Sequence, residues 1–204
     1  MNACERLPRV VVSDIFGRTP ELDRWAARLP GVAAVVDPYG GHRRRFASDA
    51  DAYAAFVSEM GVEGYSAQLA RCLRALDGPV SVLGFSAGGA AAWCLPPDVP
   101  VTGVLCFYPS QVRHHADSAP AWPVHVVLPQ HESHFSVDEL ATRVAQHPTV
   151  TLTRSVGAHG FMNPLSSGFD ARLSEAVSAM VYAQAANACV SHCDVGAALN
   201  PSAT

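Results

Sequence analysis

The sequence predicts an α/β fold in which a mostly parallel sheet is covered by helices on both faces. Short apolar runs rich in β-branched residues alternate with stretches of helical periodicity, which is typical of strand–helix–strand units. The chain has 204 residues, of which 49% are hydrophobic and 16% charged, so it can bury one sizeable core. We therefore expect a single domain over residues 1–193, without a large cap domain, and a disordered tail over 194–204.

Six apolar runs have the length and composition of buried strands. The first of them is bounded by Pro8 and Gly17, two residues that commonly end a regular element. No internal repeat or linker interrupts the alternation of strands and helices. The expected strands are 10–13, 32–36, 79–85, 101–107, 122–128 and 150–153.

Helix signals occupy the intervals between these runs. Thr19 followed by Pro20 is a capping residue followed by a proline at the first helical position, and Ser136 with Glu139 three residues later forms a capping box. The patterning between Arg43 and Met60 is less regular. The expected helices are 20–29, a segment around 51–60, 65–76, a segment that follows Ser86 and ends before Pro96, 136–146 and 171–186.

The third run leads into Gly84-Phe85-Ser86-Ala87-Gly88, which has the G-x-S-x-G pattern of a nucleophile elbow. In such an elbow the serine occupies a strained turn between strand and helix, so that its oxygen projects above the sheet. Glycines two residues before and after the serine remove the side chains that would otherwise collide there. A plain strand-to-helix turn is the alternative interpretation of the motif.

A nucleophilic serine needs a base, and His159 is the candidate. It follows the sixth strand, and Gly157 and Gly160 allow its loop to fold toward Ser86. The order of serine, acid and histidine along an α/β sheet places the acid in between. Glu132 directly follows the fifth strand, whereas Asp117 precedes that strand and Asp138 lies in the next helix. We therefore predict Glu132 as the residue that orients His159, with the backbone amides of Ala87 and Ile15 as oxyanion donors.

The composition argues against several other kinds of chemistry. The sequence contains no lysine, which excludes Schiff-base catalysis, pyridoxal phosphate attachment and a P-loop. A net charge of −4 gives no reason to expect nucleic acid or an anionic membrane as a partner. No apolar run reaches the length of a bilayer span, and most of the six cysteines lie in apolar runs. We expect a cytoplasmic protein without a cofactor.

Several histidines and cysteines lie close together in the sequence without the spacing of a metal site. His131-Glu132 begins like the zinc-protease motif, but the next histidine, His134, follows after three residues instead of four and in a loop. Near the C-terminus, the Cys189, His192 and Cys193 group lacks a fourth ligand. We therefore predict no metal site, and regard metal-dependent hydrolysis, with His114 and His115 as further ligands, as a minor alternative.

Over residues 9–185 the chain resembles the dienelactone hydrolase family of α/β-hydrolases. The matching pieces are Ser13-Asp14-Ile15-Phe16-Gly17, Val36-Asp37-Pro38-Tyr39, Gly84-Phe85-Ser86-Ala87-Gly88-Gly89, Phe107-Tyr108 and His159-Gly160-Phe161. The resemblance implies an α/β-hydrolase fold and the cleavage of esters or lactones through a covalent acyl-enzyme, without metal or cofactor. The chain departs from the family in having Ser86 where dienelactone hydrolases have cysteine, and Glu132 where they usually have aspartate. Asp14 occupies the place of an acidic residue that those enzymes hold beside their thiol.

These observations favour a serine hydrolase that acts on a small ester or lactone, with Tyr39, Phe85 and Phe161 as candidate substrate-binding residues. Core packing accounts for these three aromatic residues equally well. Arg43, Arg44 and Arg45 could recognise a substrate carboxylate, although adjacent arginines are more often solvated. The alternatives are a ligand-binding protein that keeps the fold without turnover, or a thioesterase or peptidase of the same superfamily.

Overall fold

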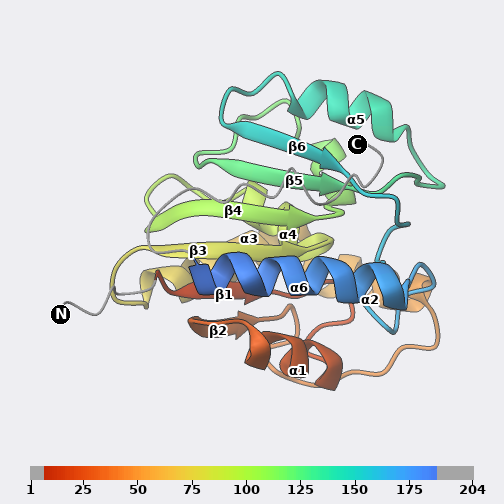
Figure 1. Cartoon of the computed structure of the whole chain (residues 1–204), viewed down its shortest axis with the longest axis horizontal. Helices are drawn as coiled ribbons and strands as arrows, with labels where there is room; N and C mark the ends of the chain where they lie inside the picture. The colour runs from red at the N-terminus through yellow and green to blue at the C-terminus, as the bar shows by residue number, and fades with distance from the viewer. Residues whose placement is uncertain (1–6, 188–204) are drawn as a thin grey trace.

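The computed structural model describes residues 7–187, which form a six-stranded sheet covered by helices on both faces (Figure 1). The strand order is β2-β1-β3-β4-β5-β6, and every neighbouring pair is parallel. The predicted α/β-hydrolase fold is thereby confirmed, whereas the predicted tail over 194–204 lies outside the described residues. The strands are β1 (Arg9–Val12), β2 (Val32–Val36), β3 (Val80–Phe85), β4 (Val101–Phe107), β5 (Val124–Leu128) and β6 (Val150–Arg154).

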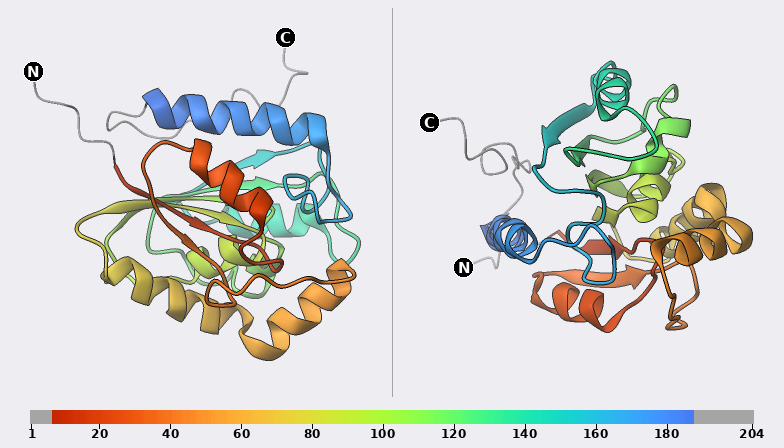
Figure 2. Two further views of the ribbon diagram at one scale, coloured as in Figure 1. Left: turned by 90° about the horizontal axis from the view of Figure 1, so that it is seen from below. Right: turned by 90° about the vertical axis from the view of Figure 1, so that its right-hand side faces the viewer.

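The helices divide between the two faces of the sheet, as Figure 2 shows. One face packs against α1 and α6, and the other against α2 to α5, in two separate hydrophobic clusters. Strand residues alternate between these clusters, since Val10 and Val12 belong to one and Val11 to the other. The helices are α1 (Pro20–Arg28), α2 (Asp49–Glu59), α3 (Gly61–Arg74), α4 (Ala87–Trp93), α5 (Val137–Val144) and α6 (Ala171–Asn187), with a 3₁₀ helix η1 (Ser110–His114) after β4.

The predicted caps are present at two helices. The Thr19 hydroxyl accepts a hydrogen bond from the Leu22 amide at 3.1 Å, and the Ser136 hydroxyl accepts one from the Glu139 amide at 3.2 Å. The start of α3 differs from expectation by four residues. This helix begins at Gly61, which has a φ of 66° and follows α2 almost directly. The sequence also did not predict η1.

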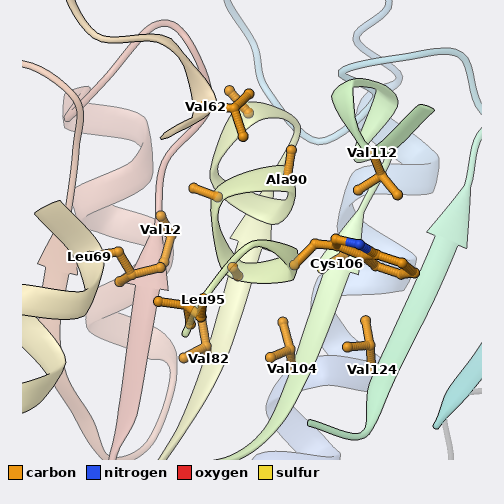
Figure 3. Packing of buried hydrophobic residues seen from close by; sticks show 14 of the residues in the cluster. Val12, Val62, Leu69, Val82, Ala90, Leu95, Val104, Cys106, Val112 and Val124 are labelled. Atoms are coloured by element: carbon orange, nitrogen blue, oxygen red, sulfur yellow. The ribbon is translucent and has the colours of Figure 1, made fainter. Parts of the chain in front are cut away.

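Small residues allow α4 to lie close to the sheet. All seven of its residues are buried, and Ala90 packs among valines of the central strands in the larger hydrophobic cluster (Figure 3). Leu69 of α3 reaches the same cluster from the side. Close packing of this kind leaves little freedom for the segment that joins β3 to α4. None of the described helices has the length and apolar character required to cross a membrane.

The order of the strands determines where a site can form. From β1 the chain crosses by way of α1 to the edge strand β2, whereas from β3 it crosses by way of α4 in the opposite direction. Because α1 and α4 lie on opposite faces, the connections that leave the carboxyl ends of β1 and β3 run to opposite sides of the sheet. In open parallel sheets, ligands bind at such a switch point. Ser86 lies directly at this point.

Candidate active site

Ser86 occupies the strained turn that the elbow motif requires. Its backbone has φ 48° and ψ −113°, and it joins β3 to α4. A Cβ added to Gly84 would lie 2.6 Å from the Gly89 amide nitrogen, and one added to Gly88 would lie 2.4 Å from the Ser13 carbonyl oxygen. Both contacts are with backbone, so neither glycine can be replaced without moving the chain. The turn therefore has the geometry of a nucleophile elbow.

His159 lies within hydrogen-bonding distance of Ser86. Its Nε2 is 2.9 Å from the Ser86 Oγ, although the two residues come from the ends of β6 and β3. Gly160 has a φ of 75° and turns the chain immediately after the histidine. The ring of Tyr108 packs beside the imidazole with centroids 5.2 Å apart. This contact limits the orientations that the imidazole can adopt.

Glu132 approaches the other side of the imidazole. Its Oε1 lies 2.7 Å from the His159 Nδ1, and its side chain is only 8% exposed. Burial alone would raise the pKa of Glu132, but the hydrogen bond and charge of His159 and a hydrogen bond from Ser110 bring it below its ordinary value. The lowered pKa favours the ionised carboxylate, which can accept a hydrogen bond from an N–H at the His159 Nδ1. The role of this pair toward Ser86 stays a prediction.

Ser110 is a part of the site that the sequence analysis missed. It is buried in η1, its Oγ lies 2.6 Å from the His159 Nδ1, and its hydroxyl hydrogen-bonds to the Glu132 Oε1. A hydroxyl has one proton and two lone pairs, so it can donate to Glu132 while accepting part of the Nδ1–H interaction. The position of Ser110 just after β4, at the carboxyl edge of the sheet, was the available signal.

The two predicted oxyanion donors lie on the segments that follow β1 and β3. Ala87 is the first residue of α4, where a backbone amide has no partner within the helix. The Ile15 amide donates no hydrogen bond to any of the described residues, and the Ile15 carbonyl accepts one from the Tyr39 hydroxyl at 2.7 Å. Neither amide donates a hydrogen bond to another residue in the range 7–187, while Tyr39 holds the Ile15 loop in position. Their role toward a substrate stays a prediction.

The three candidate substrate-binding aromatics lie in different surroundings. Phe85 lines a pocket next to the elbow. Tyr39 is buried with Arg44 over its ring at 4.9 Å, and burial raises the pKa of Tyr39 to about 12, so its hydroxyl stays protonated. Phe161 is fully buried between the rings of Phe107 and Tyr108, and neither it nor Tyr39 lines the pocket.

Two of the three adjacent arginines form ion pairs with carboxylates. Arg43 pairs with Asp23 at 2.6 Å, and Arg44 pairs with Glu59 at 2.5 Å. Within residues 7–187, no three histidine, cysteine, aspartate or glutamate side chains form a group that could hold a metal ion. The C-terminal group of Cys189, His192 and Cys193 lies outside the described residues.

The chain is similar to a known protein family and to a curated relative. The model of the dienelactone hydrolase family matches residues 3–189. The uncharacterized protein YczH of Bacillus subtilis is 33% identical over 96 residues, which cover 46% of this chain and 48% of YczH, so the match spans about half of that relative.

Solved structures resemble the fold at low sequence identity. Est1E from Butyrivibrio proteoclasticus superimposes with a TM-score of 0.56 at 12% identity, over 91% of this chain and 89% of Est1E. The NocB thioesterase domain, in a covalent complex with a fluorophosphonate nocardicin G analogue, gives a TM-score of 0.52 at 15% identity over 91% and 96%. The family match extends over most of the chain, and the chain therefore belongs to the dienelactone hydrolase family of α/β-fold hydrolases.

Proposed function

We propose that this protein is a serine hydrolase that cleaves small carboxylic esters or lactones through a covalent acyl-enzyme. The observation that carries the proposal is the hydrogen-bonded series from Ser86 through His159 to Glu132, in which the serine occupies a strained elbow. The neighbouring segments supply two free amides, those of Ala87 and Ile15. This arrangement has the parts that acyl transfer requires, namely a nucleophile, a base, an orienting acid and oxyanion donors.

In the first half of the reaction, the Ser86 Oγ attacks the carbonyl carbon as the His159 Nε2 takes its proton. The developing oxyanion is stabilised by the Ala87 and Ile15 amides. Glu132 holds the Nδ1 proton and stabilises the imidazolium, and Ser110 keeps the Glu132 carboxylate in place. His159 then returns the proton to the alcohol oxygen as the bond between that oxygen and the carbonyl carbon breaks, which leaves the acyl group on Ser86.

In the second half, a water molecule takes the place of the alcohol. His159 accepts one proton from this water as its oxygen attacks the acyl carbon, and then returns the proton to the Ser86 Oγ as the ester bond to the enzyme breaks. The acid is released and the free enzyme is regenerated. The imidazole of His159 mediates every proton transfer in the cycle, and the two amides act only on the oxyanion.

The test is the hydrolysis of short-chain p-nitrophenyl esters by the purified protein, with a chelator present. We expect turnover that falls by at least about 10⁴-fold in Ser86→Ala. The exposed serine variant Ser58→Ala serves as the control and should keep full activity. A fluorophosphonate probe should add covalently to Ser86, as detected by peptide mass spectrometry. Absence of both turnover and labelling would contradict the proposal and favour a binding protein of the same fold.

A further inference from the structure

A small pocket adjoins the proposed catalytic residues on the α1 and α6 side of the sheet. Its volume is about 150 Å³, and it lies between α1, the loop after β1 and the loop that follows His159. Two of its lining residues directly precede catalytic positions, since Phe85 comes before Ser86 and Asp14 before Ile15. An acyl group whose carbonyl carbon lies at Ser86 would therefore have this pocket beside it.

The walls of the pocket are largely apolar and well fixed. The Trp25 ring packs edge-to-face on Phe85 with centroids 5.2 Å apart, and its indole N–H donates to the Ser178 hydroxyl at 2.8 Å. Leu22 contributes to the same wall, and Phe169, which is 39% exposed, lines the pocket from the loop after His159. An apolar cavity of about 150 Å³ is large enough to hold a benzene ring. The pocket therefore suits a group of about six non-hydrogen atoms.

The charged groups of the pocket are acidic. Asp14 is buried and accepts hydrogen bonds from the Phe16 amide at 2.9 Å and from the Asn163 side-chain amide at 2.6 Å. Neither partner has a charge, so an ionised Asp14 has no cation bonded to it. The burial of Asp14 raises the pKa of its carboxyl group. The other lining carboxylate, Glu21, pairs with Arg24 at the surface.

No basic side chain is available to receive an anion in this pocket. None of the described residues that line it is an arginine or a histidine. Three arginines of the neighbouring loops are paired with carboxylates, Arg18 and Arg43 with Asp23 and Arg44 with Glu59. Arg45, in the same loop as Arg43 and Arg44, is exposed and does not line the pocket. A ligand carboxylate would thus lose its hydration without gaining a cationic partner, and it would lie in the same pocket as Asp14.

We infer that this pocket receives the acyl part of the substrate, and that it selects an uncharged acyl group of about six non-hydrogen atoms over one that ends in a carboxylate. The inference rests on the proposed hydrolysis and adds the substrate class. It assigns Asp14 a role in specificity, and it makes Phe169 a residue that limits the length of the acyl chain.

The test compares kcat/KM for three p-nitrophenyl esters, namely the pentanoate, the octanoate and the hydrogen glutarate. The glutarate ester differs from the pentanoate in having a terminal carboxylate in place of the methyl group. We expect kcat/KM for the pentanoate to be at least about 100-fold higher than for the hydrogen glutarate and about tenfold higher than for the octanoate. Equal or better hydrolysis of the hydrogen glutarate would overturn the inference, as would equal or better hydrolysis of the octanoate.

Two variants connect these preferences to the pocket. Asp14→Asn removes the charge at constant size and should reduce the preference for the pentanoate over the hydrogen glutarate by about tenfold. Phe169→Ala opens the pocket and should bring octanoate hydrolysis close to that of pentanoate. Leu165→Ala, an exposed leucine of the same loop that does not line the pocket, is the matched control and should change neither ratio. Unchanged ratios in both pocket variants would contradict the assignment.

A separate binding measurement distinguishes failure of this inference from failure of the proposed function. If the wild-type protein hydrolyses none of the esters, the proposed hydrolysis is wrong, and titration calorimetry on Ser86→Ala then tests the pocket alone. Its probes are pentanamide, which is uncharged, and glutaramate, which has a terminal carboxylate. Binding of pentanamide without glutaramate would support the charge selection. Equal binding of both, or binding of neither, would overturn it.

Discussion

The proposed nucleophile, Ser86, and the proposed acid, Glu132, are held in position in two different ways. Ser86 lies on a segment in which every residue from Val82 to the end of α4 is buried, and Gly84 and Gly88 lie against backbone atoms. Glu132 lies on a partly exposed loop after β5, where one isolated bridge pairs His131 with Ala158. The nucleophile is thus positioned by backbone sterics over a few residues, whereas the acid depends on side chains brought from β4 and β6.

This difference predicts where each part of the site is vulnerable. A change at the elbow moves backbone and should affect both the fold and the activity, because the end of β1 and the loop after it lie against Gly88. A change at the acid should affect activity much more than stability. Four measurements, in order of decreasing expected effect, test this contrast.

The largest effect is expected for Gly88→Ala. The new methyl group would lie 2.4 Å from the Ser13 carbonyl oxygen and 2.6 Å from that of Val12, so the loop after β1 must move away. We expect the free energy of unfolding, measured by urea denaturation, to fall by about 2–3 kcal/mol. Activity should fall by more than about 100-fold. The control is Gly103→Ala, whose added Cβ makes only an ordinary contact of 3.6 Å with the Pro123 carbonyl. Equal stability of the two variants would show that the elbow is not sterically constrained.

The next effect is expected for Glu132→Gln. The amide keeps the size of the side chain but cannot stabilise the imidazolium, and it can hold the wrong imidazole tautomer, so kcat should fall by about 10²–10⁴-fold. Thermal unfolding should change little. The exposed Glu139→Gln variant on α5 is the matched control and should behave as the wild type. Activity within twofold of the wild type would remove Glu132 from the triad.

A smaller effect is expected for Ser110→Ala. Loss of a hydrogen bond to the Glu132 carboxylate should lower kcat/KM by about tenfold. It should also raise the pKa of Glu132, because the Ser110 hydroxyl contributes to lowering it, so the acidic limit of the activity profile should move to higher pH. Ser110→Thr keeps the hydroxyl and should restore the profile. An unchanged pH profile in Ser110→Ala would mean that Ser110 only fills space.

The smallest effect concerns stability as a function of pH. The pKa of Glu132 is lower in the folded protein than its ordinary value, so its ionised form stabilises the fold above the unfolded pKa, and this stabilisation is lost as pH falls through the folded pKa. The wild type should therefore lose unfolding free energy relative to Glu132→Gln as the pH is lowered from neutral to about pH 4. Urea titrations at both pH values measure it, and a difference independent of pH would contradict the lowered pKa.

Much of this site follows from local sequence patterns. The elbow around Ser86 and the glycines beside His159 are positions where backbone sterics allow few residue types, so the residues themselves indicate the conformation. The inner strands β1, β3 and β5 were predictable for a related reason, because almost all of their residues are buried and most of them are apolar. The early start of α3 was not predictable, since it depends on the φ of Gly61 and on the direct junction with α2.

Other features were decided only when the chain folded. Ser110 has no distinguishing neighbours in the sequence, and it became part of the site because η1 turns it toward the Nδ1 of His159, 49 residues away along the chain. The ion pairs of Arg43 and Arg44 likewise depend on the fold, because their carboxylate partners lie on α1 and α2. The sequence alone determined the sheet, the elbow and the order of serine, acid and histidine, because short-range sterics and burial encode them. Only the tertiary structure determined that Ser110 contacts Glu132 and that the charged groups of the pocket are carboxylates. Both features depend on side-chain contacts between distant segments.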